Sequence, residues 1–278
     1  MKDLKLFFEE INNGINNVDE NSLRENVIEF INGLNAGSLR TAEPDGNGNW
    51  RVNSWVKQAI LTLFKIGKLK DMSIDNNFKF FDKDTIPLKD FSIENNIRIV
   101  PGGSSVRTGA YLAPGVICMP PMYINIGAYI DEGTMIDSHA LVGSAAQIGK
   151  RVHISAAAQV GGVLEPAGAR PVIIEDDVMV GGNCGIYEGV MLRKIVVLGS
   201  GVILTASTKV FDLVNESVLQ STPEKPLEIP ESAVVVPGTR AINTDFGKKY
   251  GLTISSPLII KYRNDKTDAR TSLNYDLR

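Results

Sequence analysis

Hydrophobic residues recur at every sixth position between about Val100 and Val210. Counted in steps of six from Val100 to Val160, and again from Ile174 to Val210, 17 of 18 positions hold Ile, Val or Leu. A second set of small residues, such as Ala128, stands two positions before the large ones. A six-residue period is neither the 3.6-residue period of an amphipathic helix nor an uninterrupted two-residue alternation. It predicts a mainly β fold built as a left-handed parallel β-helix.

The physical basis of this period is a triangular prism in which each hexapeptide forms one strand and one corner. Three hexapeptides make a coil of 18 residues, so the 18 positions predict about six coils. The large aliphatic side chain fills the interior, and the small one fits where the faces converge. Glycines that follow the aliphatic residues, such as Gly143 and Gly181, are expected to supply positive φ at the corners. The left hand is inferred from the hexapeptide pattern itself.

The frame of the repeat slips once along the chain. Val160 and Ile174 are 14 residues apart, two more than two hexapeptides. We therefore expect residues 161–173 to leave the prism as a loop. Loops that leave a rigid scaffold commonly carry function, so this segment is a candidate part of an active site.

The residues before the repeat predict an α-rich N-terminal domain over 1–96. Ser22 to Glu25 has the form of a capping box, which would begin a helix there. Asn35 to Gly37 supplies a helix stop, residues 44–49 form a turn, and a second amphipathic helix is expected from about Ser54.

The β-helix is expected to span 97–212, and the hexapeptide pattern is expected to stop after that. Four prolines then predict an irregular connection. Strands are expected within 252–262 and a short helix over 266–278. We expect 213–278 to form a small α+β cap, because the open end of a β-helix otherwise exposes unpaired strand edges.

The composition mainly excludes several classes of function. The formal net charge is −3 and charged residues make up 22%, so nothing indicates nucleic acid or a membrane surface as partner. No run of 18 apolar residues and no signal-peptide pattern occurs, which favours a cytoplasmic protein. Cys118 and Cys184 lack the spacing of a zinc or disulfide site and are expected to pack in the core. No metal site is predicted.

Several strings resemble one enzyme family closely. They include NIGAYIDEGTMID at 125–137, GGVLEP at 161–166, and LRTAE at 39–43. The chain resembles tetrahydrodipicolinate N-succinyltransferase of bacterial lysine and diaminopimelate synthesis over about residues 20–278. This resemblance implies a homotrimer with sites between subunits. It also implies succinyl-CoA as co-substrate, a cyclic imine dicarboxylate as acceptor, and no permanently bound cofactor.

The resemblance implies direct attack of an amine on the thioester, without a covalent enzyme intermediate. It also implies that the acceptor ring opens by hydration, which exposes this amine. Arg98 matches a substrate-binding arginine of the family, and a guanidinium suits a carboxylate. Asp137 matches the family's substrate-binding aspartate, which can orient the amine and accept its proton.

One position departs from the family. Some members carry a glutamate, proposed as a second catalytic carboxylate, where this chain has Gly185. The sequence leaves open whether Asp137 acts with water, with Glu165 of the expected loop, or with Glu188, three residues beyond Gly185. His139 and His153 are weaker candidates for a base.

The remaining candidates concern the thioester. Backbone N–H groups near Gly162 and Gly182 are expected to meet the thioester oxygen, because a missing side chain lets a ligand approach closely. Lys209 and Lys261 are candidates for the CoA phosphates, together with Lys248 and Lys249.

Other functions compete with succinyl transfer. An N-acetyltransferase acting on the same acceptor shares the repeat, although the long N-terminal domain and Arg98 favour the succinyl form. A zinc-dependent β-helix hydratase needs three histidine ligands, and the chain has two histidines. A non-catalytic β-helix scaffold remains the alternative outside enzymes.

Overall fold

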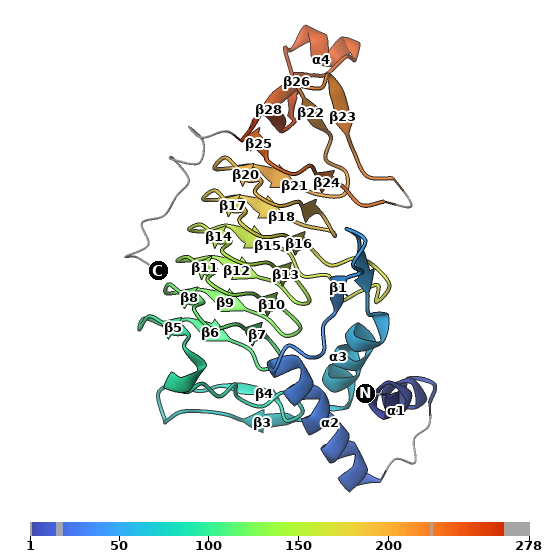
Figure 1. Ribbon diagram of the computed structural model, residues 1–278, viewed down its shortest axis with the longest axis vertical. Helices are drawn as coiled ribbons and strands as arrows, with labels where there is room; N and C mark the ends of the chain where they lie inside the picture. Colours follow the sequence, from blue (N-terminus) through green and yellow to red (C-terminus); the bar gives the residue numbers. More distant parts are fainter. Residues whose placement is uncertain (1, 15–18, 223–224, 264–278) are drawn as a thin grey trace.

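The computed structural model describes residues 2–14, 19–222 and 225–263. Its centre is a left-handed parallel β-helix whose coils stack along the long axis of the molecule (Figure 1). Each coil places one short strand in each of three sheets. We call these the first, second and third sheets, in the order in which the chain visits them. The predicted fold class is confirmed.

Strands one coil apart pair in parallel within each sheet. The first sheet contains β5 (Arg98–Ile99), β8 (Ile117–Cys118), β11 (Met135–Ile136), β14 (His153–Ile154), β17 (Met179–Val180), β20 (Val197–Leu198) and β25 (Ala233–Val236). The second contains β6 (Ser105–Val106), β9 (Tyr123–Ile124), β12 (Leu141–Val142), β15 (Gln159–Val160), β18 (Gly185–Ile186) and β21 (Ile203–Leu204). The third contains β7 (Tyr111–Leu112), β10 (Tyr129–Ile130), β13 (Gln147–Ile148), β16 (Ile173–Ile174), β19 (Met191–Leu192) and β24 (Glu228–Ile229).

The large residues of the repeat fill the interior of the prism, as the six-residue period predicts. Ile136, Val142 and Ile148 are each 1% exposed or less and belong to one continuous core cluster. The small residues Ala140 and Ala146 lie in the same cluster. Burial of a single aliphatic side chain contributes about 1.5–3 kcal/mol, so this column is the main stabilising element of the fold.

The expected role of the corner glycines was wrong. Gly143 and Gly181 do not have positive φ. A Cβ at Gly143 would lie 2.2 Å from the Gly162 nitrogen, and one at Gly181 would lie 2.6 Å from the Leu198 oxygen. These positions need glycine because neighbouring coils approach closely. Positive φ occurs two residues later, for example at Ala145 (69°).

The frame differs from the expectation at two places. Ile99, rather than Val100, aligns with Cys118, so the first coil is one residue longer than the repeat. Ile148 aligns with Ile174 in adjacent coils of the third sheet. The interval from Val160 to Ile174 therefore contains one hexapeptide step and an eight-residue insertion, not two steps and a two-residue slip.

The repeat does not stop at Asp212, which corrects a second expectation. After β21 the chain leaves the prism and returns, so that β24 and β25 extend the third and first sheets. The cap is built from β22 (Val210–Asp212), β23 (Ser217–Leu219), β26 (Thr239–Ala241), α4 (Asp245–Lys249), β27 (Thr253–Ser255) and β28 (Leu258–Tyr262). Strands β22, β23 and β28 continue the first sheet beyond β25 and cover its end. Strands within 252–262 were predicted; the helix expected over 266–278 lies outside the described residues.

The N-terminal region contains the predicted helices. It also contains two hairpins, β1–β2 and β3–β4, whose strands the sequence pattern did not predict. Its elements are α1 (Lys2–Asn12), α2 (Glu20–Asn35), β1 (Ala42–Pro44), β2 (Trp50–Val52), α3 (Ser54–Ile66), β3 (Leu69–Asp71), β4 (Phe81–Lys83) and the 3₁₀ turn η1 (Ile93–Asn95). Helix α2 begins earlier than expected, because Asp19 accepts the Ser22 N–H as its cap. The capping box at Ser22 was therefore wrong, whereas the helix stop and the start at Ser54 are confirmed.

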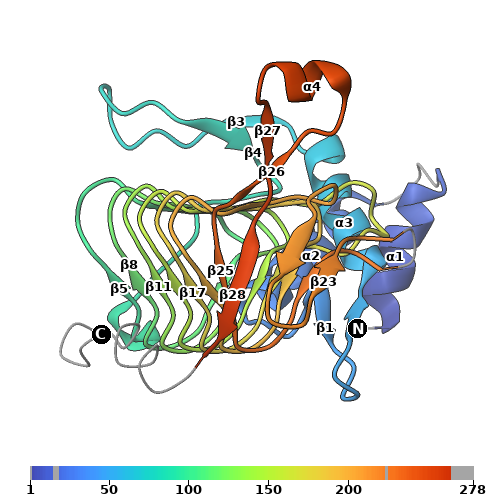
Figure 2. The same cartoon turned by 90° about the horizontal axis from the view of Figure 1, so that it is seen from above.

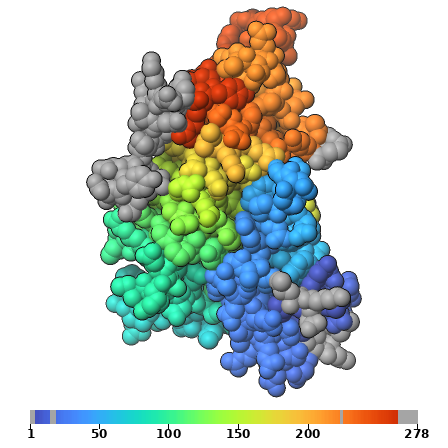
Figure 3. Space-filling model, viewed as in Figure 1, coloured from blue at the N-terminus to red at the C-terminus, as the bar shows by residue number. Residues whose placement is uncertain are grey.

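The N-terminal helices lie on one side of the prism (Figures 1 and 2), where α2 packs against β7 of the third sheet. The space-filling view shows the N-terminal region lying against the coils (Figure 3). Arg40 joins the two, since its guanidinium carbon lies 3.6 Å from the ring centroid of Tyr129 and its Nε donates to Gln147. Thr41 donates to the Ala145 carbonyl at 2.8 Å. Burial lowers the pKa of Arg40, and the nearby Tyr129 and Asp131 offset part of that effect. The division into three domains at 96 and 212 stays a prediction.

Among the described helices, none combines the length and the apolar character that a membrane crossing would require.

Candidate active site

The candidate residues lie on different edges of the prism. We call the corners between the first and second sheets the first edge; residues 137–140 form one of them. Corners between the second and third sheets form the second edge, which includes residues 187–190 and the insertion. Asp137 and Gly182 belong to the first edge, whereas Gly162, Glu165 and Glu188 belong to the second. A single chain therefore does not bring all of them together.

Asp137 follows β11 directly, where the chain turns out of the first sheet. Its Oδ1 accepts the Ser138 N–H at 2.7 Å, which fixes the carboxylate at the corner and leaves Oδ2 facing His153 Nε2 at 3.7 Å. The Asp137 side chain is 30% exposed and that of His153 is 13% exposed. Asp137 is thus held by the backbone but remains accessible to a ligand.

Arg98 lies on β5 of the same sheet and is exposed. Strand β5 pairs with β8 and β8 pairs with β11. Two strand spacings correspond to about 10 Å, a separation that one dicarboxylate and a flexible guanidinium side chain can bridge. The candidate carboxylate-binding arginine and the candidate amine-binding aspartate therefore share one face of the prism.

A cavity of about 1350 Å³ opens along the second edge. One wall is the insertion, with Gly162 and Glu165. Another is formed by the corner residues Tyr187 and Glu188, and a third by the β1–β2 hairpin with Trp50. The cavity thus brings three of the predicted site residues, Gly162, Glu165 and Glu188, into one place.

Tyr187 occupies the space beside Gly185. A Cβ at Gly185 would lie 2.4 Å from Cε2 of the tyrosine ring, so a larger residue there requires the ring to move. The Tyr187 hydroxyl donates to Gln159 Oε1 at 3.0 Å. Tyr187 therefore presents a phenol to the cavity, and its hydroxyl is held by the Gln159 amide oxygen. No pattern in the sequence pointed to either residue.

The two glutamates have different surroundings. Glu188 accepts the Ala206 N–H through Oε2 at 2.8 Å, which ties two coils together. Glu165 lies in the insertion and is exposed. The Gly162 N–H has no hydrogen-bond acceptor among the described residues, and Gly162 lines the cavity, so this N–H stays a candidate donor to a thioester oxygen. Gly162 packs tightly against Ser144, because a Cβ added at Gly162 would lie 2.8 Å from the Ser144 nitrogen.

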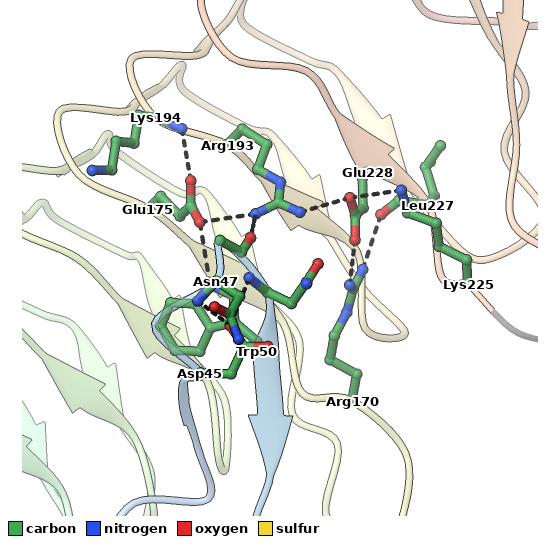
Figure 4. Close-up of polar contacts among 12 residues, drawn as sticks. Asp45, Asn47, Trp50, Arg170, Glu175, Arg193, Lys194, Lys225, Leu227 and Glu228 are labelled. Carbon is green, nitrogen blue, oxygen red and sulfur yellow. Dashed lines mark hydrogen bonds and ion pairs between the residues drawn. The ribbon is translucent and has the colours of Figure 1, made fainter.

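Sequence reasoning missed a polar network beside the cavity (Figure 4). Glu228 lies on β24 and pairs with Arg170 at 2.6 Å, with Arg193 at 3.0 Å and with Lys225 at 3.2 Å. Burial raises the pKa of Glu228, but these arginines outweigh that effect and hold it below the ordinary value. Arg193 also pairs with Glu175 at 3.2 Å.

The same network reaches the N-terminal hairpin. Trp50 Nε1 donates to Glu175 at 3.2 Å, and Arg193 donates to the Gly48 carbonyl at 2.7 Å. Residues from the hairpin, the middle coils and the returning strand β24 thus meet at one side of the cavity. The network fixes the shape of that side and leaves Lys225, the most exposed cation, toward solvent.

The four predicted phosphate-binding lysines lie at the C-terminal cap, with Lys248 and Lys249 on α4. Lys209 precedes β22 and is exposed, and Lys261 lies on β28 opposite Val234. Several coils of the prism separate them from Asp137. In the parts of the chain that the structure describes, no group of three His, Cys, Asp or Glu side chains could hold a metal ion.

Comparisons with known proteins match both parts of this architecture. The family model "Tetrahydrodipicolinate N-succinyltransferase N-terminal" matches residues 2–66, and "Hexapeptide repeat of succinyl-transferase" matches residues 171–206. A 2,3,4,5-tetrahydropyridine-2,6-dicarboxylate N-succinyltransferase from Azoarcus sp. is 43% identical over 263 residues, covering 92% of this chain and 90% of the relative.

This chain belongs to the tetrahydropyridine-dicarboxylate N-succinyltransferase family. A second relative of the same name, from Bartonella bacilliformis, is 39% identical and covers 99% of this chain and 98% of its own length. A solved structure of a putative N-succinyltransferase from Campylobacter jejuni is 18% identical, with a TM-score of 0.49, over 84% of this chain and 62% of that chain. The resemblance inferred from the strings at 125–137 and 161–166 is confirmed.

Proposed function

We propose that this protein transfers a succinyl group from succinyl-CoA to the amine of ring-opened tetrahydrodipicolinate, in lysine and diaminopimelate synthesis in the cytoplasm. The observation that carries the proposal is identity of about 40% to relatives of that name over nearly the whole chain. The amine nitrogen forms a bond to the thioester carbon, the carbon–sulfur bond breaks, and CoA leaves as the thiolate.

We assign the acceptor to the face that carries Arg98 and Asp137. The guanidinium pairs with a substrate carboxylate, since a planar fork fits two carboxylate oxygens. Asp137 orients the ammonium group and accepts a proton as the amine becomes nucleophilic. The hydrogen bond that it accepts from the Ser138 N–H and the partial exposure of its side chain support this role.

The acyl donor is assigned to the second-edge cavity. Gly162 lies in its wall, and its N–H, which has no acceptor among the described residues, is a suitable donor to the oxygen that becomes negative in the transition state. Glu165 and Glu188 at its rim are candidates for a second carboxylate. Lys209 and Lys261 on the cap, and the corner at Gly182, stay candidates for contacts to the CoA phosphates and the pantetheine arm.

We propose that the active unit is a homotrimer. Asp137 lies on the first edge and Arg98 on the first sheet, whereas the cavity lies on the second edge of the same prism, so one chain alone separates them. A cyclic trimer places the first edge of one subunit against the second edge of the next, and each interface then contains both halves.

The trimer predicts a defined particle mass. The chain has a mass of 30.2 kDa, so light scattering coupled to size-exclusion chromatography is expected to give about 90 kDa. A mass of 30 kDa for an active enzyme would contradict sites shared between subunits.

Turnover itself is tested by release of the CoA thiol. We expect release from succinyl-CoA only when the dicarboxylate acceptor is present, and a kcat/KM with acetyl-CoA at least about tenfold lower, a difference of about 1.4 kcal/mol. Comparable turnover with acetyl-CoA would favour an N-acetyltransferase. Absence of thiol release with either donor would favour a non-catalytic scaffold.

A further inference from the structure

Lys57 is a buried lysine in the N-terminal helix α3. Its side chain is 0% exposed, and it lies in a helix whose neighbouring buried residues include Val56, Ile60 and Leu63. Burial lowers the pKa of its amine to about 8. An ammonium group in such a place is costly unless it makes specific hydrogen bonds. The sequence keeps a lysine where an apolar side chain of similar length would pack.

The amine of Lys57 reaches the insertion of the β-helix. Its Nζ donates to the Ala169 carbonyl at 2.7 Å and to the Pro166 carbonyl at 3.2 Å. The Ala169 N–H also donates to the Pro166 carbonyl at 2.9 Å, so the two carbonyls belong to one turn. The described ion pairs give Lys57 no carboxylate partner. Both hydrogen bonds that Lys57 Nζ donates to described residues go to this turn.

Other hydrogen bonds and ion pairs hold the two ends of the insertion, and Leu164 packs against the hydrophobic cluster of the N-terminal helices. Val163 donates to the Ser144 carbonyl at 3.1 Å near the start. Arg170 donates to the Gly189 carbonyl at 3.0 Å and pairs with Glu228 at the end. Between these anchors, the backbone from 165 to 169 is tied to the rest of the molecule by Lys57.

The tied segment borders the second-edge cavity. Glu165 directly precedes Pro166, and both line the cavity together with Gly162. Lys57 itself does not line it. Any effect of Lys57 on a ligand therefore passes through the position of the insertion.

We propose that Lys57 is a positioning residue, which holds residues 161–172 as a preformed wall of the acyl-donor cavity. This inference rests on the proposed function only for what the cavity binds. A fixed wall places the Gly162 N–H and Glu165 before the donor arrives, so that binding does not have to order them. The Lys57 amine holds the insertion in place through its two hydrogen bonds, whereas an apolar residue at this site could fill the space but could not donate them.

The test compares Lys57→Met with Lys89→Met. Lys89 is the matched control because burial also lowers its pKa to about 8, while its Nζ donates to Asn35 Oδ1 at 2.7 Å, away from the insertion. Methionine keeps most of the side-chain volume and removes the charge and the donors. We expect both variants to fold with a Tm close to that of the wild type.

Hydrogen exchange measures the order of the wall directly. In Lys57→Met, we expect faster exchange at the Val163 and Ala169 amides, which are hydrogen-bonded in the insertion, and unchanged exchange in the coils. We expect kcat/KM for succinyl-CoA to fall by about 10²-fold, with a raised KM. A mere loss of folded protein lowers kcat without raising KM. Lys89→Met is expected to match the wild type in every measurement.

Three outcomes would overturn the inference. They are unchanged exchange at 161–172 in Lys57→Met, faster exchange with wild-type kinetics, and reduced activity shared equally by Lys89→Met. If Lys57→Met does not fold, Lys57→Gln replaces it with the same expectations, because its shorter side chain ends before the two carbonyls. The exchange measurement uses no substrate. An inactive wild type would therefore contradict the proposed function, while the contact between Lys57 and the insertion would still be tested.

Discussion

Asp137→Asn is expected to lower kcat by about 10²–10⁴-fold, the usual contribution of a general acid or base. The asparagine has nearly the same size and can still accept the Ser138 N–H that fixes Asp137 now. It cannot accept a proton from the attacking amine and does not attract an ammonium group. The substitution thus removes the chemistry while keeping the corner. Steady-state thiol release, with the particle mass as a check on assembly, measures the effect.

Asp131→Asn is the matched control for this substitution. Asp131 also follows the last residue of a strand, and its Oδ1 accepts the Glu132 N–H at 2.8 Å, just as Asp137 accepts from Ser138. It lies on the edge between the third and first sheets, away from the candidate site. We expect kcat of Asp131→Asn to stay within about twofold of the wild type, as is usual for a surface substitution. Equal losses in both variants would mean that the corner, and not the proton transfer, had been damaged.

His153 lies beside Asp137 and gives the experiment a second readout. At 3.7 Å from Asp137 Oδ2, its Nε2 is too far for a direct hydrogen bond. If Asp137 is the base, His153→Gln is expected to keep most of the turnover. Loss of turnover in His153→Gln, with full activity in Asp137→Asn, would exchange the two roles.

Much of the fold follows from local sequence because its contacts are nearly periodic. A coil stacks on the coil 18 residues away, so the residue that aligns with Ile136 is Ile154, and the same spacing recurs through most of the chain. The interior of the prism accepts large aliphatic residues at one position of each hexapeptide. The repeat therefore predicts the strands, the core and the architecture together.

The return of the chain into the prism was missed because prolines interrupt the pattern. Yet a signal was present: Leu227 and Ile229 stand two residues apart, as do Ala233 and Val235. Ile229 and Val235 are six apart, which is the repeat frame again. Their strands β24 and β25 pair with β19 and β20 across an excursion of more than 20 residues. The sequence could have shown two further hexapeptides, although not which sheets they join.

The site was harder to predict than the fold because its groups come from distant segments. Family resemblance pointed to Arg98 and Asp137, and the frame slip pointed to the insertion with Gly162 and Glu165. No period relates Trp50, Arg193 and Glu228, which meet only because the hairpin and the returning strand pack on the same coils. The contact of Lys57 with the insertion has the same origin, since more than 100 residues separate them.

The polar network around Glu228 leads to the second large expected effect. Glu228→Ala is expected to lower the free energy of unfolding by about 3–5 kcal/mol, the cost of removing one partner from a buried ion pair. Arg170 is only 12% exposed and Arg193 only 22% exposed, so both would lose a carboxylate in a place that water reaches poorly. Urea unfolding, with the slope checked against that of the wild type, measures the loss.

Glu231→Ala serves as the control because Glu231 is exposed and lies three residues further along the chain. Its unfolding free energy is expected to stay within about 0.5 kcal/mol of the wild type. A loss in Glu228→Ala no larger than that would mean that the network contributes no net stability.

The pH dependence of the same variant separates charge from packing. The ion pairs hold the pKa of Glu228 below its ordinary value of 4.5, so the unfolded chain takes up this proton first as the pH falls. The stabilisation is therefore fully present above about pH 4.5 and is lost as the pH falls through the lowered pKa. We expect wild type and Glu228→Ala to differ most near neutral pH and to approach each other in acid. A constant difference would assign the effect to lost packing. A converging one would show that the charge of Glu228 holds the insertion, the middle coils and the returning strand together.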